Sequence, residues 1–192
     1  MKALLLTLLV SLSAFAEESA LLKYDYVGIA AGKTTYSNGS PNLDQYGVGF
    51  QKLLNQNIFI GASYYSGRQN YAAFYVNFNE YDFDLGSRFT VNDKMDAILD
   101  ITLGSIDATA NPGSKITGSG QSIYLGIRSS INPNVEVELG AISTSATVNS
   151  TTETSSHLKL GAAYNVNPQF QIAAGISLGD PQTQFLGLKM FY

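Results

Sequence analysis

The sequence predicts an all-β fold: a closed, antiparallel, up-and-down barrel of ten membrane-crossing strands, with eight strands as the alternative. Three repeated features predict it: ten segments of alternating apolar and polar residues, a glycine site in each segment, and four polar turns built on Asn. No apolar run approaches the roughly 18 residues that a spanning helix needs, so a membrane crossing would have to use strands. Such strands must close on themselves because backbone groups in lipid have no water to bond.

Side chains alternate between the two faces of a strand, so a period of two in hydrophobicity indicates strands with one apolar face. The apolar parity switches around Asn79 and Glu80, which predicts a β-bulge there, because a bulge inserts one residue into the alternation. The expected strands span residues 23–36, 45–54, 57–66, 71–91, 95–107, 120–131, 135–147, 155–166, 170–179 and 183–192.

The four turns each begin with an aliphatic residue followed by Asn. Asn and Pro suit tight turns, since Asn tolerates unusual backbone angles and Pro presets φ. The Asn residues are 37, 40 and 35 positions apart, which leaves room for two strands and one loop in each interval. Four such turns on the side of both termini indicate ten strands. These turn residues are Asn55, Asn92, Asn132 and Asn167.

The glycine sites lie among the apolar residues of each strand, so each glycine points to the opposite, polar face. That face is therefore expected to be the concave one. The sites are Gly28, Gly47 with Gly49, Gly61, Gly86, Gly104, Gly126, Gly140, Gly161, Gly175 and Gly187.

Residues 1–16 form an expected cleaved signal peptide, with Lys2, an apolar run and a small-x-small site at Ala14 to Ala16. Residues 17–192 are then a single barrel domain. Removing Lys2 leaves ten basic against fifteen acidic residues, a net charge of 10 − 15 = −5. Because the chain is acidic and has no basic cluster, nucleic acid is not an expected partner. The absence of Cys excludes a disulfide scaffold.

The C-terminal strand places Leu186, Leu188, Met190 and Tyr192 on one face and ends on the aromatic residue. This ending resembles the assembly signal of bacterial outer-membrane β-barrels. The whole mature chain resembles the small outer-membrane barrels of the OmpA and OmpX type, whose usual member has eight strands. The resemblance implies export to the outer membrane of a Gram-negative cell envelope, with outer-membrane lipid, lipopolysaccharide and the assembly machinery as partners, and we expect a monomer.

Alternation alone also fits a soluble β-sandwich. The signal segment, the final strand and a second face rich in Gly, Ser, Thr and charges favour the barrel. We expect this second face to line the lumen. Its charged residues fall mostly near the expected periplasmic turns, where Arg88 should pair with Asp96 or Asp100 and Arg128 with Glu136 or Glu138, because unpaired charges in a narrow barrel are costly. The expected lumen charge network comprises Asp84, Arg88, Asp96, Asp100, Arg128, Glu136, Glu138, Lys159 and Lys189.

The chain offers little for catalysis. His157 is the one histidine. In small-barrel lipid A deacylases a Ser follows the catalytic His by two residues, but Lys159 occupies that position here. We therefore expect no catalytic, cofactor-binding or metal-binding residues. The predicted function is that of a non-enzymatic structural or narrow-pore, porin-like protein with a charged constriction near the periplasm. One alternative is a lipid-modifying barrel enzyme using His157 with Ser155 or Ser156, and a second is a surface adhesion or binding barrel.

Overall fold

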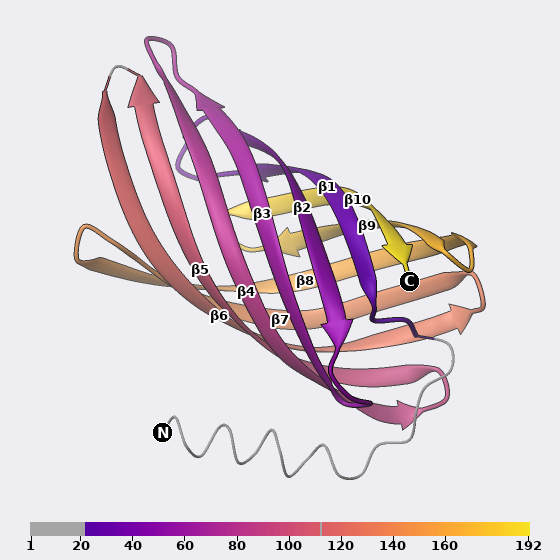
Figure 1. The fold of residues 1–192 in the computed structure, drawn as a ribbon. Coiled ribbons are helices and arrows are strands. Elements are labelled where there is room, and N and C mark those ends of the chain that lie inside the picture. Colours follow the sequence, from indigo (N-terminus) through magenta and orange to yellow (C-terminus); the bar gives the residue numbers. More distant parts are fainter. Residues whose placement is uncertain (1–21, 112) are drawn as a thin grey trace.

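The computed structural model describes residues 22–111 and 113–192, which form one closed barrel of ten antiparallel strands (Figure 1). Each strand pairs with its neighbours in sequence, and β1 closes the sheet against β10. The predicted fold class and strand number are confirmed. The strands are β1 (Tyr26–Thr35), β2 (Leu43–Leu53), β3 (Ile58–Asn70), β4 (Tyr75–Asn92), β5 (Met95–Asn111), β6 (Ser114–Asn132), β7 (Val135–Val148), β8 (Thr151–Asn167), β9 (Phe170–Leu178) and β10 (Gln182–Phe191).

The four Asn turns share one local structure. In each, the Asn side chain accepts a hydrogen bond from the backbone N–H two residues later, which closes the turn without help from a neighbouring segment. The donor N–H groups and their acceptors are Asn57 to Asn55 (2.8 Å), Lys94 to Asn92 (2.9 Å), Asn134 to Asn132 (2.9 Å) and Gln169 to Asn167 (2.8 Å).

The prediction of a β-bulge at Asn79 and Glu80 is wrong. β4 pairs without interruption through both residues on its two sides, and its one register shift lies between Thr90 and Asn92, beside a turn. The parity switches because β4 continues past the apolar band of the barrel. Beyond that band the outward residues are polar: Asn79 accepts a hydrogen bond from the outward Tyr64 hydroxyl.

The expected strand bounds, 95–107 and 120–131, left a loop over residues 108–119, and this prediction is also wrong. β5 runs to Asn111 and β6 starts at Ser114, so the strands fill most of that interval. β3 likewise continues to Asn70, past its expected end at residue 66, whereas β4 begins at Tyr75 and not at the expected residue 71. β7 and β8 meet at Asn149 and Ser150, both of which have positive φ. These hairpins rise above β1, β9 and β10, so the wall is uneven in height (Figure 1).

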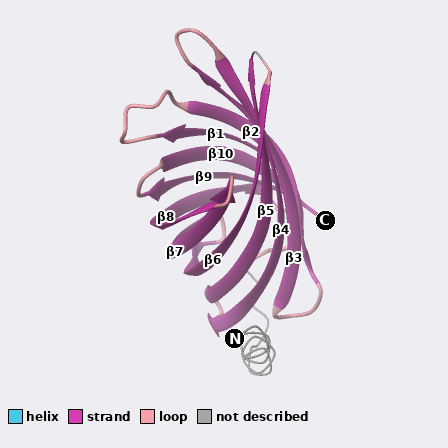
Figure 2. Cartoon of the chain, turned by 90° about the vertical axis from the view of Figure 1, so that its left-hand side faces the viewer, coloured by secondary structure: helices cyan, strands magenta, loops and turns pink. Residues whose placement is uncertain are grey.

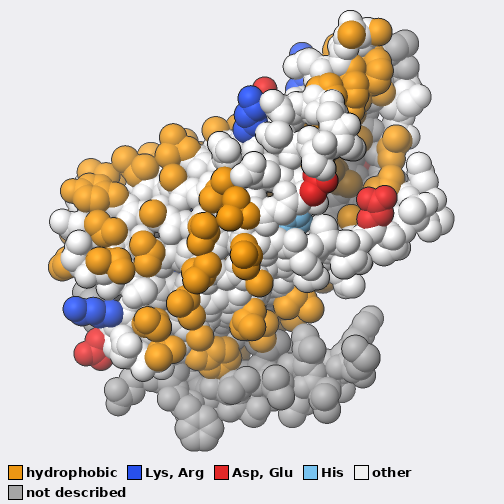
Figure 3. All heavy atoms as spheres, turned by 180° about the vertical axis from the view of Figure 1, so that it is seen from behind, with side chains coloured by type: hydrophobic (Ala, Val, Ile, Leu, Met, Phe, Trp, Pro, Cys, Tyr) orange, Lys and Arg blue, Asp and Glu red, His pale blue; other side chains and the backbone are white. Residues whose placement is uncertain are grey.

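The outer surface carries the apolar faces of the strands, and Figure 3 shows many of these hydrophobic side chains on one side of the barrel. Leu125 is 63% exposed there and Ile29 59%, values that suit a lipid-facing surface. Val27 and Ile29 face outward on β1, so Tyr26 faces inward. Within the described part of the chain no helix could cross a membrane. The strands instead curve around a common interior, the lumen (Figure 2).

Candidate functional site: the barrel lumen

Two buried ion pairs lie near the end of the lumen that carries the Asn turns, the expected periplasmic end. Arg88 Nη1 on β4 lies 3.3 Å from Asp96 Oδ2 on β5, and these side chains are 2% and 0% exposed. Arg128 Nε on β6 donates to Glu136 Oε2 on β7 at 2.9 Å. Both pairs join neighbouring strands across a turn on a diagonal: the register places Ile98 opposite Arg88 and Glu138 opposite Arg128, and each bonded carboxylate lies two residues nearer the turn. Asp100 and Glu138, the other expected partners, form no ion pair with these arginines, although Glu138 lies opposite Arg128 in the register.

The other lumen charges lie further from the turns. Lys159 Nζ is 3.0 Å from Glu138 Oε1, and Thr102 donates to Asp84 Oδ1 at 2.8 Å. Lys189 Nζ lies 4.5 Å from the centre of the Tyr26 ring, a distance typical of a cation–π contact. Asp100 lines the same space.

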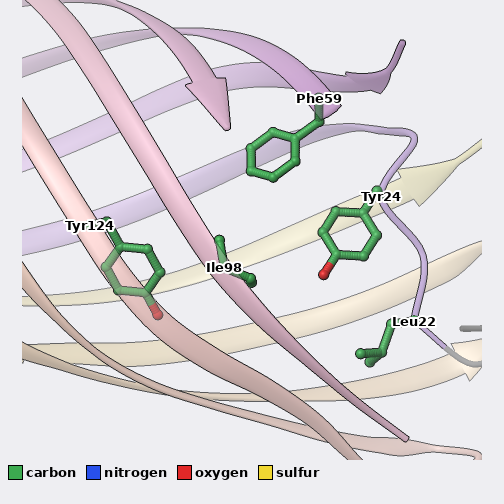
Figure 4. Packing of buried hydrophobic residues seen from close by; sticks show 5 residues of the cluster. All are labelled: Leu22, Tyr24, Phe59, Ile98 and Tyr124. Atoms are coloured by element: carbon green, nitrogen blue, oxygen red, sulfur yellow. The ribbon is translucent and has the colours of Figure 1, made fainter. Parts of the chain in front are cut away.

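The segment before β1 places side chains inside the lumen, which the sequence did not indicate. Residues 23–25 were expected to belong to the first strand, but β1 starts at Tyr26. Leu22 and Tyr24 are only 4% and 2% exposed and pack with Phe59, Ile98 and Tyr124 inside the barrel (Figure 4). No periodic pattern could reveal a segment that is neither strand nor helix.

Tyr24 lies at the centre of the two ion pairs. Its hydroxyl donates to Asp96 Oδ2 at 2.9 Å, and the guanidinium carbons of Arg88 and Arg128 lie 4.8 and 5.0 Å from its ring centre. The Phe59 ring is 5.8 Å away. Arg128 also donates from Nη1 to the Lys23 carbonyl at 3.0 Å. The ion pairs and residues 22–24 together occupy this end of the lumen, and we call them the floor.

Asp25 fixes the point where this segment joins the wall. Its carboxylate accepts hydrogen bonds from Lys52 Nζ and from the Leu53 N–H, both at 2.6 Å. Partial burial favours a higher pKa for Asp25, but the bonds from Leu53 and Lys52 outweigh it and hold the pKa below its ordinary value.

Above the floor the lumen holds two adjoining cavities of about 430 and 520 Å³. The first is lined largely by small residues of β1, β2, β9 and β10, such as Gly28, Ala30 and Ala173. The second is lined by polar and acidic residues of β3 to β7, including Asp82 and Asp100, and Tyr24 forms part of its boundary.

His157 faces the lumen on β8, and its Nε2 lies 2.9 Å from Ser155 Oγ. Its Nδ1 is buried and has no hydrogen-bond partner in the described structure, so no third residue orients the ring there as a hydrolytic triad requires. The described residues also contain no group of three or more His, Cys, Asp or Glu side chains placed to hold a metal ion.

The residues of the expected assembly signal lie on the outer face of the closing strand. Leu186, Leu188 and Met190 are exposed to the lipid side on β10, and Tyr192 follows the strand with 61% of its surface exposed. The Tyr192 N–H donates to the Asp25 carbonyl at 3.4 Å, and Lys52 Nζ lies 5.1 Å from its ring centre.

Comparison with known proteins adds a family to this geometry. The model of the outer membrane protein beta-barrel domain matches residues 3–186. Among solved structures, Neisserial surface protein A is similar with 15% identity and a TM-score of 0.52, over 88% of this chain and 96% of that one. The beta domain of the Bordetella autotransporter Brka has 9% identity and a TM-score of 0.54, over 88% and 99%. Such low identities support the fold alone. No curated protein matches the chain in sequence. The chain therefore belongs to the outer membrane protein beta-barrel domain family and is a β-barrel of the bacterial outer membrane.

Proposed function

We propose that this protein is a non-enzymatic, narrow-pore barrel that passes small hydrophilic solutes intermittently across the outer membrane. The observation that carries the proposal is the lumen itself, in which two cavities of about 430 and 520 Å³ lie above a charged floor. A barrel that served only as a structural wall would have no need of such space.

The floor acts as a constriction near the periplasm. Arg88 with Asp96, and Arg128 with Glu136, place buried charges at this end of the lumen, and such charges resist separation because each would be left without a partner. Ions would therefore pass only when the floor rearranges. A small or intermittent conductance follows.

The Ser155 and His157 pair supports the non-enzymatic assignment. It faces the lumen, whereas membrane lipid lies against the outer surface, so a lipid-modifying enzyme would have its pair on the wrong side. The proposal predicts unchanged lipid A in a strain that expresses the protein. Mass spectrometry of that lipid A would test it, and loss of an acyl chain that depended on His157 would contradict it.

The outer surface suggests the partners. The exposed apolar band suits outer-membrane lipid, the polar surface above it suits lipopolysaccharide, and the exposed ending at Tyr192 suits recognition by the assembly machinery. We propose a monomer, because a closed barrel leaves no unpaired strand edge for another copy.

Planar-bilayer recording tests the pore. We expect rare, small current steps from the wild type and larger or more frequent steps from Arg128→Ser, which breaks the pair with Glu136. The matched control is Arg68→Ser, since Arg68 is exposed on β3 near the opposite end of the barrel, where it donates to Asn77. A wild-type conductance as large as that of a general porin, or equal currents in Arg128→Ser and the wild type, would overturn the proposed constriction.

A further inference from the structure

The N-terminal segment is positioned to close the lumen, and its contacts show how it could open. We propose that residues 22–24 form a releasable plug that closes the periplasmic mouth and leaves the barrel by turning about Asp25. This proposal adds regulation to the pore and so rests on the proposed function.

The plug contacts one side of the barrel wall. Tyr24 contacts residues of β3, β4, β5 and β6, namely Phe59, Arg88, Asp96 and Arg128. Figure 4 shows Tyr24 and Leu22 projecting from a chain that passes beside the barrel wall, with no strand pairing of their own. The segment is therefore held by side chains and not by a backbone ladder.

The ion pairs do not depend on the plug. Arg88 with Asp96, and Arg128 with Glu136, are bonded directly to each other across neighbouring strands. If Tyr24 left, both arginines would keep their carboxylate partners, so no buried charge would lose its ion-pair partner. Release would break the hydrogen bonds from Tyr24 to Asp96, from Arg128 to the Lys23 carbonyl and from Lys23 to the Pro168 carbonyl. It would also break the cation–π contacts of the Tyr24 ring and of the Lys23 ammonium, and expose the buried Leu22 and Tyr24 side chains.

Asp25 marks the end of the movable part. Its side chain is bonded to Lys52 and Leu53 at the end of β2, and its carbonyl accepts from the Tyr192 N–H. These bonds tie residue 25 to both strands that flank β1. Residues 22–24, in contrast, are tied by the contacts of Tyr24, by Arg128 and by the Lys23 ammonium, which donates to the Pro168 carbonyl.

Cysteine labelling tests the release, because the chain has no Cys of its own. Leu22→Cys in lipid vesicles is treated with a membrane-impermeant maleimide, alone and combined with Tyr24→Phe. Two reference variants bracket the rate: Gln169→Cys in an exposed turn and Ser87→Cys at a fully buried strand position. We expect Leu22→Cys to react at an intermediate rate and Tyr24→Phe to raise that rate about tenfold, since it removes a hydrogen bond to a charged group. Each variant is first checked for folding by heat-modifiable mobility.

Bilayer recording of Tyr24→Ala provides the second measurement, with Tyr46→Ala on the outer face as control. We expect Tyr24→Ala to conduct for a larger fraction of time than the wild type and Tyr46→Ala to behave like the wild type.

Three outcomes would contradict these proposals. If Leu22→Cys reacts as slowly as Ser87→Cys, both alone and combined with Tyr24→Phe, the segment is a fixed part of the wall. That result refutes the plug regardless of the currents recorded. If labelling follows the expectation but no variant conducts, Arg128→Ser included, the segment is releasable and the pore is refuted. If the wild type conducts and Tyr24→Ala leaves its currents unchanged, the segment does not close the mouth.

Discussion

At the scale of single residues, the inward glycines leave space for aromatic rings of the lumen. A Cβ added to Gly86 would lie 2.0 Å from the Phe59 ring, and one added to Gly140 would lie 2.4 Å from the Tyr124 ring. Real Cβ atoms never approach so closely, so each ring occupies the volume that a side chain would need. Part of the glycine repeat thus reflects ring packing across strands, whereas a Cβ at Gly61 or Gly104 would instead meet a lumen carboxylate.

Gly140→Ala should therefore lower stability by about 1–3 kcal/mol, the usual cost of overpacking. The added methyl group would push the Tyr124 ring out of its cluster with Tyr24 and Ile98. Gly120→Ala is the matched control, because the nearest atom to its Cβ would lie at 3.5 Å. Urea unfolding in lipid vesicles measures both variants, and equal midpoints would contradict this packing.

The sequence predicted which residues face the lumen, because strand parity fixes the face of each side chain. It left the partner of Arg88 open between Asp96 and Asp100, since these residues lie two positions either side of Ile98, the residue opposite Arg88, and the choice depends on which way the side chains lean. It missed Tyr24 entirely. That residue's role comes from where the chain enters the barrel, and no local pattern encodes this.

At the scale of strands, the ten elements and four turns could be predicted, but the ends of the longest strands could not. The alternation used to find strands reflects lipid on one side and the lumen on the other. Where β4, β5 and β6 rise above the apolar band, this contrast disappears and the strand continues without its signal. The loop expected at residues 108–119 was an error of this kind.

The last strand supports a prediction about assembly. Replacing Tyr192 with Asp should lower the amount of heat-modifiable, folded protein in the outer membrane, because the exposed aromatic ending would become charged. Tyr192→Phe keeps the ring and should restore the wild-type amount. Gel mobility of unheated membrane fractions measures this, and an unchanged folded fraction in Tyr192→Asp would refute the assembly role.

The loops that flank the seam between β1 and β10 support a prediction about pH. Ser37 donates to Asp180 from its hydroxyl and from its N–H, and these bonds lower the pKa of Asp180. A lowered pKa means that the link stabilises the folded loops at neutral pH and is lost as the pH falls through that pKa, below the ordinary value of 3.8. The amide chemical shift of Ser37 in micelles should titrate there, and Asp180→Asn should abolish the step. A midpoint above 3.8 would contradict the link.

At the scale of the whole molecule, the charges of the lumen are not balanced. Arg88, Arg128 and Lys159 each have a carboxylate partner. Four further carboxylates line the larger cavity, namely those of Glu80, Asp82, Asp84 and Asp100. No salt bridge in the described structure joins any of them to a basic residue. Lys189 is the remaining lining cation, and it lies over the Tyr26 ring. The wall formed by β4 and β5 is thus acidic, whereas the cavity lining from β1, β2, β9 and β10 contains no acidic residue and carries Lys189.

A solute that crosses this lumen meets the acidic wall before it reaches the floor. Charge rings of one sign raise the local concentration of the opposite ion, and the effect is strongest in a narrow space with low-dielectric walls. We therefore predict that the open pore prefers cations, and that Asp82→Asn with Asp84→Asn moves the cation-to-anion permeability ratio toward one. The reversal potential in a KCl gradient measures this ratio, and the Tyr24→Ala background supplies open events if the wild type opens rarely. Asp107→Asn is the control, because Asp107 lies on the outer side of β5, 3.4 Å from Lys115. An anion-selective pore, or a ratio that the double variant leaves unchanged, would show that the acidic wall does not act on the passing ion.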